Sequence, residues 1–259
     1  MSSGPSPTPA RPDDRPPATL LLHGLAGAGA DWRGVARRLT GPVVAPDLPC
    51  HGGRPARGEL HFEALAADVL GRLDTLGVGP VDVVGVSLGA ATAMTMAVVA
   101  PDRVRSMLLV APSWLDESDP PNLRPLRRVG RLLARAGPER AWDVLRRVPP
   151  LCHWQADVVE QQRRSFMAAD PAAVARALDE LPTVLPLVPS GSAPSRPTKV
   201  LTWTDDPVHP IALAERTAAV LGGAELDVVA RPPDWVDEAR LLASSRLSLN
   251  GAASPQHRQ

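Results

Sequence analysis

The 259-residue chain contains no tyrosine, and only one lysine and two cysteines. The absence of tyrosine removes a phenol from any acid–base role, and arginine supplies nearly all of the positive charge. Cys50 and Cys152 stand far apart without a second pair, a spacing that fits neither a disulfide framework nor a metal knuckle and suits a reducing compartment. The six histidines are too few and too scattered for metal-ligand spacing, so we expect no metal and no cofactor.

Long apolar runs and an excess of charge of either sign are also absent. No apolar stretch approaches the roughly 18 residues of a membrane span. Lys and Arg (28) balance Asp and Glu (28), so there is no overall attraction to nucleic acid. Residues 1–17 are polar and proline-rich and lack the pattern of a signal peptide, which predicts a disordered arm on a cytoplasmic protein. Residues 248–259 are interpreted as a disordered polar tail.

Short apolar runs alternate with longer segments of helical spacing over most of the chain. The runs expected to be strands are 19–22, 43–45, 81–86, 107–111, 200–203 and 226–230. The clearest helical segments are 62–76, 88–100, 211–221 and 236–247. Strands that are apolar throughout and joined by helices predict an α/β fold with a mainly parallel sheet flanked by helices.

Residues 113–197 interrupt this alternation, because they contain helical patterns and no convincing strand. An all-helical insertion between two strands predicts a cap over the carboxyl ends of the strands, where such sheets bind ligands. The core is then formed by residues 18–112 and 198–247.

Within the insertion, Arg124–Ala136 has an apolar face, and Pro138 and Pro171 suit the first turns of two further helices. Arginine is frequent between residues 124 and 164. These arginines indicate a solvated helix face or, alternatively, attraction of an anionic substrate.

The peptide that joins the third apolar run to a helical segment carries the clearest chemical signal. Its sequence is Gly85-Val86-Ser87-Leu88-Gly89. A strand that turns directly into a helix strains the backbone at its central residue, and flanking glycines let the chain segments pass closely. The turn holds the Ser87 hydroxyl at a helix N-terminus, where the Leu88 N–H can donate to a developing oxyanion. We therefore predict a nucleophilic serine; an inert serine in a glycine-lined turn is the alternative.

Together with this turn, residues 22–26 (Leu-His-Gly-Leu-Ala) resemble the His-Gly loop of the α/β-hydrolase superfamily, and the resemblance covers roughly residues 18–247. It implies that the N–H of Leu25 is a second oxyanion donor beside that of Leu88. It also implies that His23 braces the loop rather than acting as a base.

The resemblance carries further expectations for the sheet and the pocket. Members of the superfamily usually open with a hairpin of two strands, which 17 proline-rich residues cannot supply. We therefore expect a sheet of about six strands without the N-terminal hairpin, with an exposed edge that could invite a partner chain. Gly24 and Trp114 are expected to contact the substrate.

Residues 46–52 (Pro-Asp-Leu-Pro-Cys-His-Gly) are similar to the superfamily's Asp-Leu-Pro-Gly-His-Gly segment. Cys50 stands where a glycine is usual, and it lacks the basic partner that a nucleophilic cysteine needs. In this interpretation Asp47 and His51 hold a loop near the site.

The loop at residues 202–210 resembles the loop that carries the catalytic acid in the superfamily. Asp206 is the predicted acid, and Asp205 is a second choice. Asp116 is a possible substitute, because some members of the superfamily place the acid after the strand that precedes it. Helix capping near Pro210 is the alternative role for Asp206.

The catalytic base is where the sequence departs from the superfamily pattern. The loop after the last strand, residues 231–237, contains no histidine. His209 can supply the base from the acid loop, His257 can fold back from the tail, or the triad has been lost. His61 and His153 are expected to be surface or pocket-lining residues.

The sequence and the resemblance together predict a serine hydrolase that cleaves a small ester, thioester or lactone. Ser87 forms an acyl-enzyme, His209 relays the proton, and Asp206 orients the imidazole. The alternative is a protein without a working triad, acting as a ligand-binding module or as a lyase or cyclase of small-molecule biosynthesis. We expect a small-molecule partner, no nucleic acid and no membrane, and the sequence leaves the substrate and the oligomeric state open.

Overall fold

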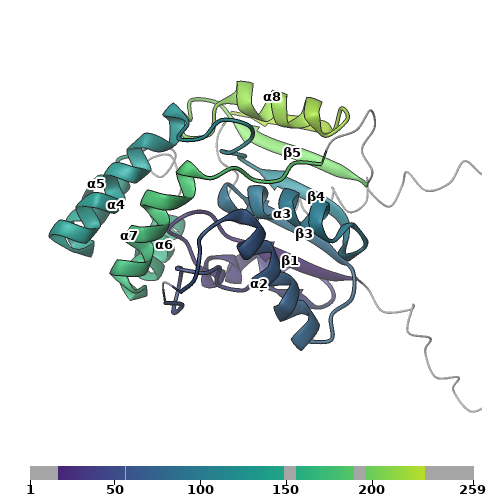
Figure 1. The fold of residues 1–259 in the computed structure, drawn as a ribbon, viewed down its shortest axis with the longest axis horizontal. Coiled ribbons are helices and arrows are strands. Elements are labelled where there is room, and N and C mark those ends of the chain that lie inside the picture. Colours follow the sequence, from purple (N-terminus) through teal and green to yellow (C-terminus); the bar gives the residue numbers. More distant parts are fainter. Residues whose placement is uncertain (1–16, 56, 149–155, 190–195, 231–259) are drawn as a thin grey trace, which may run out of the picture.

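The computed structural model describes residues 17–55, 57–148, 156–189 and 196–230. In these ranges six strands form one sheet, and every strand pairing is parallel (Figure 1). The strands are β1 (Ala18–Leu22), β2 (Val43–Val44), β3 (Val81–Val86), β4 (Val104–Val110), β5 (Thr198–Trp203) and β6 (Glu225–Val229). Their order across the sheet is β2-β1-β3-β4-β5-β6.

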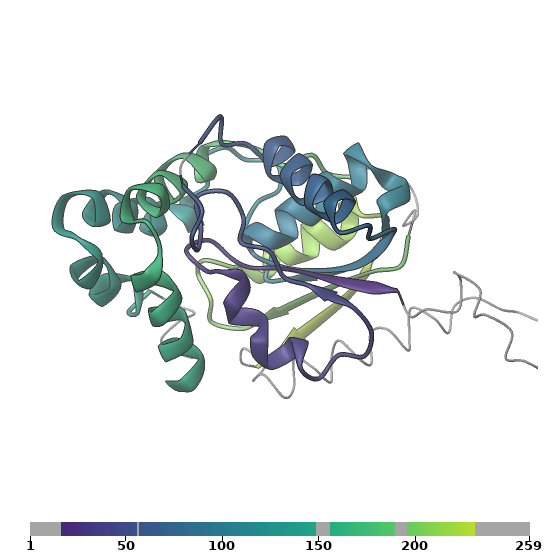
Figure 2. The ribbon, with the colours of Figure 1, turned by 90° about the horizontal axis from the view of Figure 1, so that it is seen from below.

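The sheet is covered on both faces, which explains why its inner strands are mainly apolar. One face carries α2 (Phe62–Thr75), α3 (Leu88–Val99) and α8 (Ile211–Val220), and the other carries η2 (Gly29–Trp32) and α1 (Arg33–Ala36) (Figure 2). All five residues of β1 are buried, and alternate side chains enter two separate apolar clusters. The two clusters together hold the sheet between its helical layers.

The predicted fold class, a parallel sheet of about six strands flanked by helices, is confirmed. The predicted helices at 62–76, 88–100 and 211–221 end within one residue of the observed α2, α3 and α8. β4 begins at Val104, three residues before the predicted run. The prediction started late because the exposed Arg105 interrupts the apolar pattern at the beginning of the strand. The predicted helix at 236–247 lies outside the described residues.

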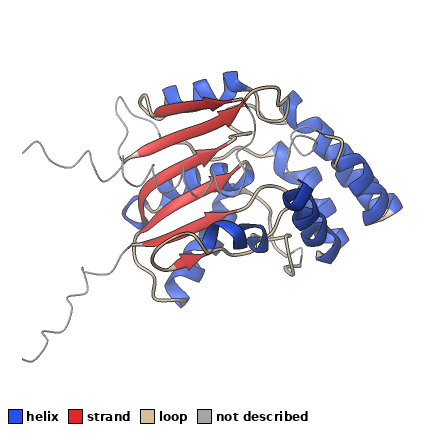
Figure 3. Ribbon diagram, turned by 180° about the vertical axis from the view of Figure 1, so that it is seen from behind, coloured by secondary structure: helices blue, strands red, loops and turns tan. Residues whose placement is uncertain are grey.

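In the described part of the connection from β4 to β5, four α-helices stand beyond the carboxyl ends of the strands (Figure 3). They are α4 (Arg124–Ala136), α5 (Pro138–Leu145), α6 (Ala156–Ala168) and α7 (Pro171–Glu180), and we call them the cap helices. The sequence predicted the starts of α4, α5 and α7. It did not predict α6, because no proline or capping residue marks the start of that helix.

Three of the five arginines of α4 lie against carboxylates of neighbouring segments. Arg127 contacts Asp119 and Asp179 at 2.7 and 3.4 Å, and Arg131 contacts Asp179 at 3.3 Å. Leu126 and Val129, on the opposite face of α4, are buried. These contacts favour the interpretation of α4 as an amphipathic helix whose charged face is balanced by its neighbours. Within the described ranges, no helix combines the length and the apolar character that crossing a bilayer requires.

Candidate active site

Ser87 occupies a strained turn between β3 and α3. Its backbone has φ 54° and ψ −106°, and its N–H donates to the carbonyl oxygen of Val110 at 2.9 Å. A Cβ on Gly85 would lie 2.3 Å from the oxygen of Gly89, and a Cβ on Gly89 would lie 2.2 Å from the oxygen of Leu22. Neither position can therefore hold a side chain without moving the backbone, which is the close passage that the sequence predicted.

The loop after β1 lies beside this turn and is braced by His23. Nδ1 of His23 donates to the oxygen of Gly24 at 2.8 Å, and Nε2 accepts from the N–H of Leu48 at 3.0 Å. Burial lowers the pKa of His23 to about 4, so the ring is neutral and both of its nitrogens are engaged. The structure thus places His23 as the brace that the sequence predicted. Leu25 lines the cavity in front of this loop.

The segment around Asp47 closes the other side of the loop. Oδ1 of Asp47 accepts from the N–H of Gly29 at 2.8 Å, and Nδ1 of His51 donates to the oxygen of Pro49 at 2.9 Å. His51 is fully buried and packs against His23, with ring centroids 5.0 Å apart. These contacts match the predicted loop-holding role of Asp47 and His51.

Cys50 is fully buried and has φ 65°, the backbone region that favours glycine. This conformation gives a physical reason for the glycine that is usual at this position. Burial raises the pKa of the Cys50 thiol, which keeps the sulfur protonated and opposes a nucleophilic role.

Asp206 and His209 form a buried hydrogen-bonded pair on the loop after β5. Oδ2 of Asp206 accepts from Nδ1 of His209 at 2.6 Å and from Nε1 of Trp203 at 2.8 Å. Oδ1 accepts from the backbone N–H groups of Val208 and His209 at 2.9 and 3.1 Å. Burial alone would raise the pKa of Asp206, but these donors hold it below its ordinary value. The carboxylate is therefore ionised and fixes the imidazole by accepting a hydrogen bond from Nδ1.

The other candidate acids point elsewhere. Asp205 is exposed and accepts only a long hydrogen bond of 3.4 Å from Thr204. Asp116 is exposed and forms an ion pair with Arg216. Among the described residues, no group of three or more His, Cys, Asp or Glu side chains is placed to share a metal ion.

His61 lies at the start of α2, away from the loops described above. His61 caps α2 by accepting from the N–H of Ala64 at 3.3 Å, and its side chain is 39% exposed. This position agrees with its predicted surface role. His153 and His257 lie outside the described residues.

Ser87 does not form a hydrogen bond with His209 in this structure. Its hydroxyl oxygen lies 3.1 Å from that of Ser113, which follows β4 and is completely buried. Nε2 of His209 is buried and has no hydrogen-bond partner among the described residues. The structure therefore brings the predicted nucleophile, acid and base to one site, with the nucleophile resting on Ser113.

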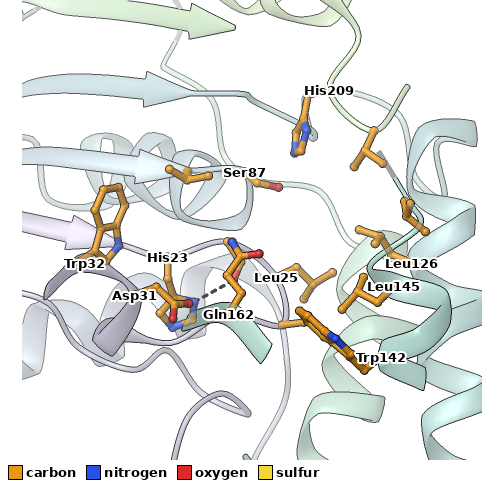
Figure 4. A pocket seen from close by; sticks show the side chains of 16 residues that line it. His23, Leu25, Asp31, Trp32, Ser87, Leu126, Trp142, Leu145, Gln162 and His209 are labelled. Carbon is orange, nitrogen blue, oxygen red and sulfur yellow. Dashed lines mark hydrogen bonds between the residues drawn. The ribbon is translucent and has the colours of Figure 1, made fainter. Parts of the chain in front are cut away.

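Ser87 and His209 face a common cavity of about 120 Å³ between the sheet edge and the cap helices (Figure 4). Core residues on its wall are His23, Gly24, Leu25, Ala26, Gly27, Asp31, Trp32, Val86, Val208 and the two catalytic candidates. The cap contributes Leu126, Trp142, Leu145, Val148 and Gln162. The cap wall is apolar except for Gln162, so it suits a substrate with an apolar portion.

Gly24 lines this cavity as expected, whereas the expectation for Trp114 is corrected. Trp114 is fully buried, packs edge-on against Phe62 with ring centroids 5.8 Å apart, and is not on the cavity wall. Its indole N–H donates to the oxygen of Leu181 at 3.1 Å. The chain turns inward after Ser113, so the next side chain enters the core rather than the pocket.

Two polar residues of the site carried no assigned role from the sequence. Ser113 follows the fourth apolar run, at the sheet edge where ligands bind, but the residue pattern does not reveal its contact with Ser87. Gln162 gave no signal, because nothing in a cap helix distinguishes an inward amide from an exposed one.

A serine on a strained strand–helix turn beside a braced His-Gly loop is typical of the α/β hydrolases, whereas the buried Asp–His pair lies within one loop instead of on two. A family model described as "Alpha/beta hydrolase family" matches residues 19–239. The chain therefore belongs to the alpha/beta hydrolase family.

Curated relatives match over short segments. A segment of 99 residues is 37% identical to "Lipase LipV" of Mycobacterium tuberculosis and covers 38% of each protein. A segment of 93 residues is 39% identical to the pimeloyl-(acyl-carrier protein) methyl ester esterase of Neisseria meningitidis and covers 35% of each protein. The matched segments thus span little more than a third of these relatives, which include a lipase and an ester esterase.

Solved structures resemble the chain over nearly its whole length. A thermophilic esterase from Thermogutta terrifontis superposes with a TM-score of 0.72 at 24% identity, covering 93% of this chain and 92% of the esterase. The enol-lactonase of Burkholderia xenovorans LB400 has a TM-score of 0.71 at 21% identity and covers 94% of both chains. At these identities the likeness shows the fold.

Proposed function

We propose that the protein is a serine hydrolase that cleaves a small ester, thioester or lactone with Ser87 as the nucleophile. The observation that carries this proposal is the buried Asp206–His209 pair. His209 lines the same cavity as Ser87, and its Nε2 has no hydrogen-bond partner among the described residues. Leaving a buried imidazole nitrogen without a hydrogen bond costs free energy of folding. A hydrogen bond from the Ser87 hydroxyl would remove that cost and would prepare the proton transfer. The lipase and esterase relatives support the same class of reaction.

In the proposed reaction, the Ser87 hydroxyl turns from Ser113 to His209 when a substrate enters. His209 takes the proton through Nε2 as the Ser87 oxygen bonds to the carbonyl carbon. The N–H groups of Leu25 and Leu88 stabilise the negative charge on the carbonyl oxygen. The proton then passes to the leaving alcohol, thiol or lactone oxygen. A water molecule next gives its proton to His209 and attacks the acyl-enzyme, which releases the acid and returns the proton to Ser87.

The cap wall supports the proposed substrate class. Leu126, Trp142 and Leu145 give an apolar surface beside Ser87, which suits the acyl or alkyl part of a small ester. We propose a neutral small molecule rather than an anion, because the described arginines of α4 are paired with carboxylates or lie outside the cavity wall.

The test is rapid mixing of the whole chain with a chromogenic short-chain ester. The proposal expects a burst of alcohol close to one equivalent per protein, followed by a slower steady rate. Ser87→Ala abolishes the burst, and His209→Ala slows it by about 10³-fold or more. His61→Asn is the matched control, since asparagine retains a helix cap on an exposed site, and it leaves the burst unchanged.

The second candidate function is a lyase, cyclase or ligand-binding protein that forms no acyl-enzyme. The resting hydrogen bond between Ser87 and Ser113 favours it, because that bond keeps the hydroxyl away from the base. A parent protein without a burst, and without labelling of Ser87 by a fluorophosphonate, would support this candidate and exclude the hydrolase.

A further inference from the structure

Asn122 bridges the two loops that carry the reacting groups. It lies in η4 (Pro121–Leu123), immediately before the first cap helix begins at Arg124. Its Nδ2 donates to the carbonyl oxygen of Val208 at 2.8 Å and to that of Ser113 at 3.2 Å. One amide nitrogen thus holds together two segments that are far apart in the sequence.

The contact with Val208 acts on the peptide unit that carries the imidazole. The carbonyl of that peptide accepts from Asn122, and its N–H, which belongs to His209, donates to Asp206 at 3.1 Å. Both polar atoms of the peptide are therefore held, and rotation of this unit would break both hydrogen bonds. The direction in which Nε2 of His209 points depends on this unit, because the ring is attached to it.

The contact with Ser113 acts on the other side of the reaction centre. The hydroxyl of Ser113 is the partner of the Ser87 hydroxyl, at 3.1 Å, and the carbonyl of the same residue accepts from Asn122. Movement of Ser113 would therefore move the resting position of the nucleophile relative to the base. Serine and imidazole must approach within hydrogen-bond reach for proton transfer, so small changes in their spacing have large effects on rate.

We propose that Asn122 is a positioning residue that sets the distance between Ser87 and His209 from the entrance of the cap. This inference rests on the proposed function, in which these two residues exchange a proton. Only an amide or another double donor can satisfy two carbonyl acceptors from one atom, which defines the residue type that this position needs. Because Asn122 lies two residues before the start of α4, the same bridge ties the first cap helix to the loops that carry Ser113 and His209.

The test compares the whole chain with Asn122→Asp, Asn122→Ser and the control Ser118→Ala. Aspartate keeps the shape but directs an oxygen at two carbonyls, and serine can donate one hydrogen bond. Ser118 lies in the same connecting segment and donates to the oxygen of Thr183 at 2.6 Å, so its loss removes a comparable anchor away from the reacting groups. For each protein, kcat and KM with a short-chain ester, the rate of Ser87 labelling by a fluorophosphonate, and the thermal midpoint are measured.

The inference expects kcat and the labelling rate of Asn122→Asp to fall by about 30-fold or more, with KM within about threefold of the parent. Asn122→Ser falls less, and Ser118→Ala stays within about twofold. If Asn122→Asp does not fold, Asn122→Ser gives the same comparison. If the parent is active and the Asn122 variants change kcat and the labelling rate no more than Ser118→Ala does, this inference is overturned and the proposed function is unaffected. A parent that neither hydrolyses the ester nor reacts with the fluorophosphonate overturns the proposed function and the inference with it.

Discussion

Nδ1 of His209 lies 2.6 Å from Oδ2 of Asp206, and both side chains are buried. The predicted acid and the predicted base therefore lie on one short loop, separated by two residues, instead of on two loops after different strands. In the proposed function, this pair takes the place of a histidine after the last strand. Because the carboxylate and the imidazole are three residues apart on one loop, their hydrogen bond does not depend on contacts between distant segments of the chain.

The first prediction concerns the Asp206–His209 contact. In Asp206→Asn the amide can present its N–H groups to Nδ1, which favours the wrong tautomer and a protonated Nε2. We expect kcat for ester hydrolysis to fall by roughly 10³-fold or more, with KM little changed. Asp205→Asn changes an exposed neighbour and is expected to retain full activity. Equal kcat values for the two variants would exclude Asp206 as the orienting acid.

The second prediction concerns two buried histidines, His23, which braces the loop after β1, and His51, which packs against His23. Burial lowers the pKa of His23 to about 4 and that of His51 to about 3, while the unfolded chain titrates near 6.5. The unfolded state therefore binds more protons below pH 6.5, and stability is lost as the pH falls through that value. We expect the free energy of unfolding to decrease by about 2 kcal/mol per histidine between pH 7 and pH 5.

Urea unfolding at a series of pH values checks this. His61→Asn alters a partly exposed histidine and should leave the slope unchanged, whereas His51→Asn should reduce it, since one buried titrating group is gone. A free energy of unfolding that is constant from pH 7 to pH 5 would show that neither buried ring is excluded from protonation.

The third prediction tests the close passage at the serine turn. A Cβ at position 89 would meet the backbone oxygen of Leu22 at 2.2 Å, so Gly89→Ala must displace β1 or α3. We expect Gly89→Ala to lose about 3 kcal/mol or more of unfolding free energy and to abolish serine labelling. Gly71→Ala, in the interior of α2 with no atom within 4 Å of the new Cβ, is expected to gain about 0.5–1 kcal/mol. Chemical denaturation of the two variants measures both effects.

The sequence was sufficient for the sheet because its signals are local. Each inner strand contains an apolar run, which one charged residue interrupts in β3, β4 and β5. The helices between strands begin at clear boundaries, as at Ser87 before α3. The serine turn was also predictable, because Gly85 and Gly89 are needed by the backbone geometry itself. The pairing of Asp206 with His209 could be suspected from their spacing, since three residues in a tight loop bring side chains together.

The remaining features depend on contacts between distant segments. Ser113 reaches Ser87 only after two neighbouring strands are aligned, and Asn122 reaches Val208 across the gap between the cap entrance and the acid loop. Trp114 shows the converse, because a large side chain beside the site turned into the core. Such directions follow from packing, which a residue pattern does not contain.

The last prediction concerns Gln162, the polar residue on the cap wall of the cavity. Figure 4 shows its carboxamide directed into the cavity on the side of Ser87, and it has no hydrogen-bond partner among the described residues. An amide in that position can bind a hydroxyl, amide or carbonyl group on the substrate next to the scissile ester. Gln162→Leu should therefore lower kcat/KM for a hydroxy- or amide-substituted ester by about tenfold.

The unsubstituted ester of equal length should be cleaved by Gln162→Leu as well as by the parent, or better, because leucine extends the apolar wall formed by Trp142 and Leu145. Gln161→Leu is the control for loss of a neighbouring amide, since Gln161 is not itself on the cavity wall and hydrogen-bonds to Ser165, Arg164 and Asp31. A parallel loss for both esters would mean that Gln162 supports the cap and does not read the substrate. A loss confined to the substituted ester requires a direct contact, because a displaced cap would slow the cleavage of both substrates.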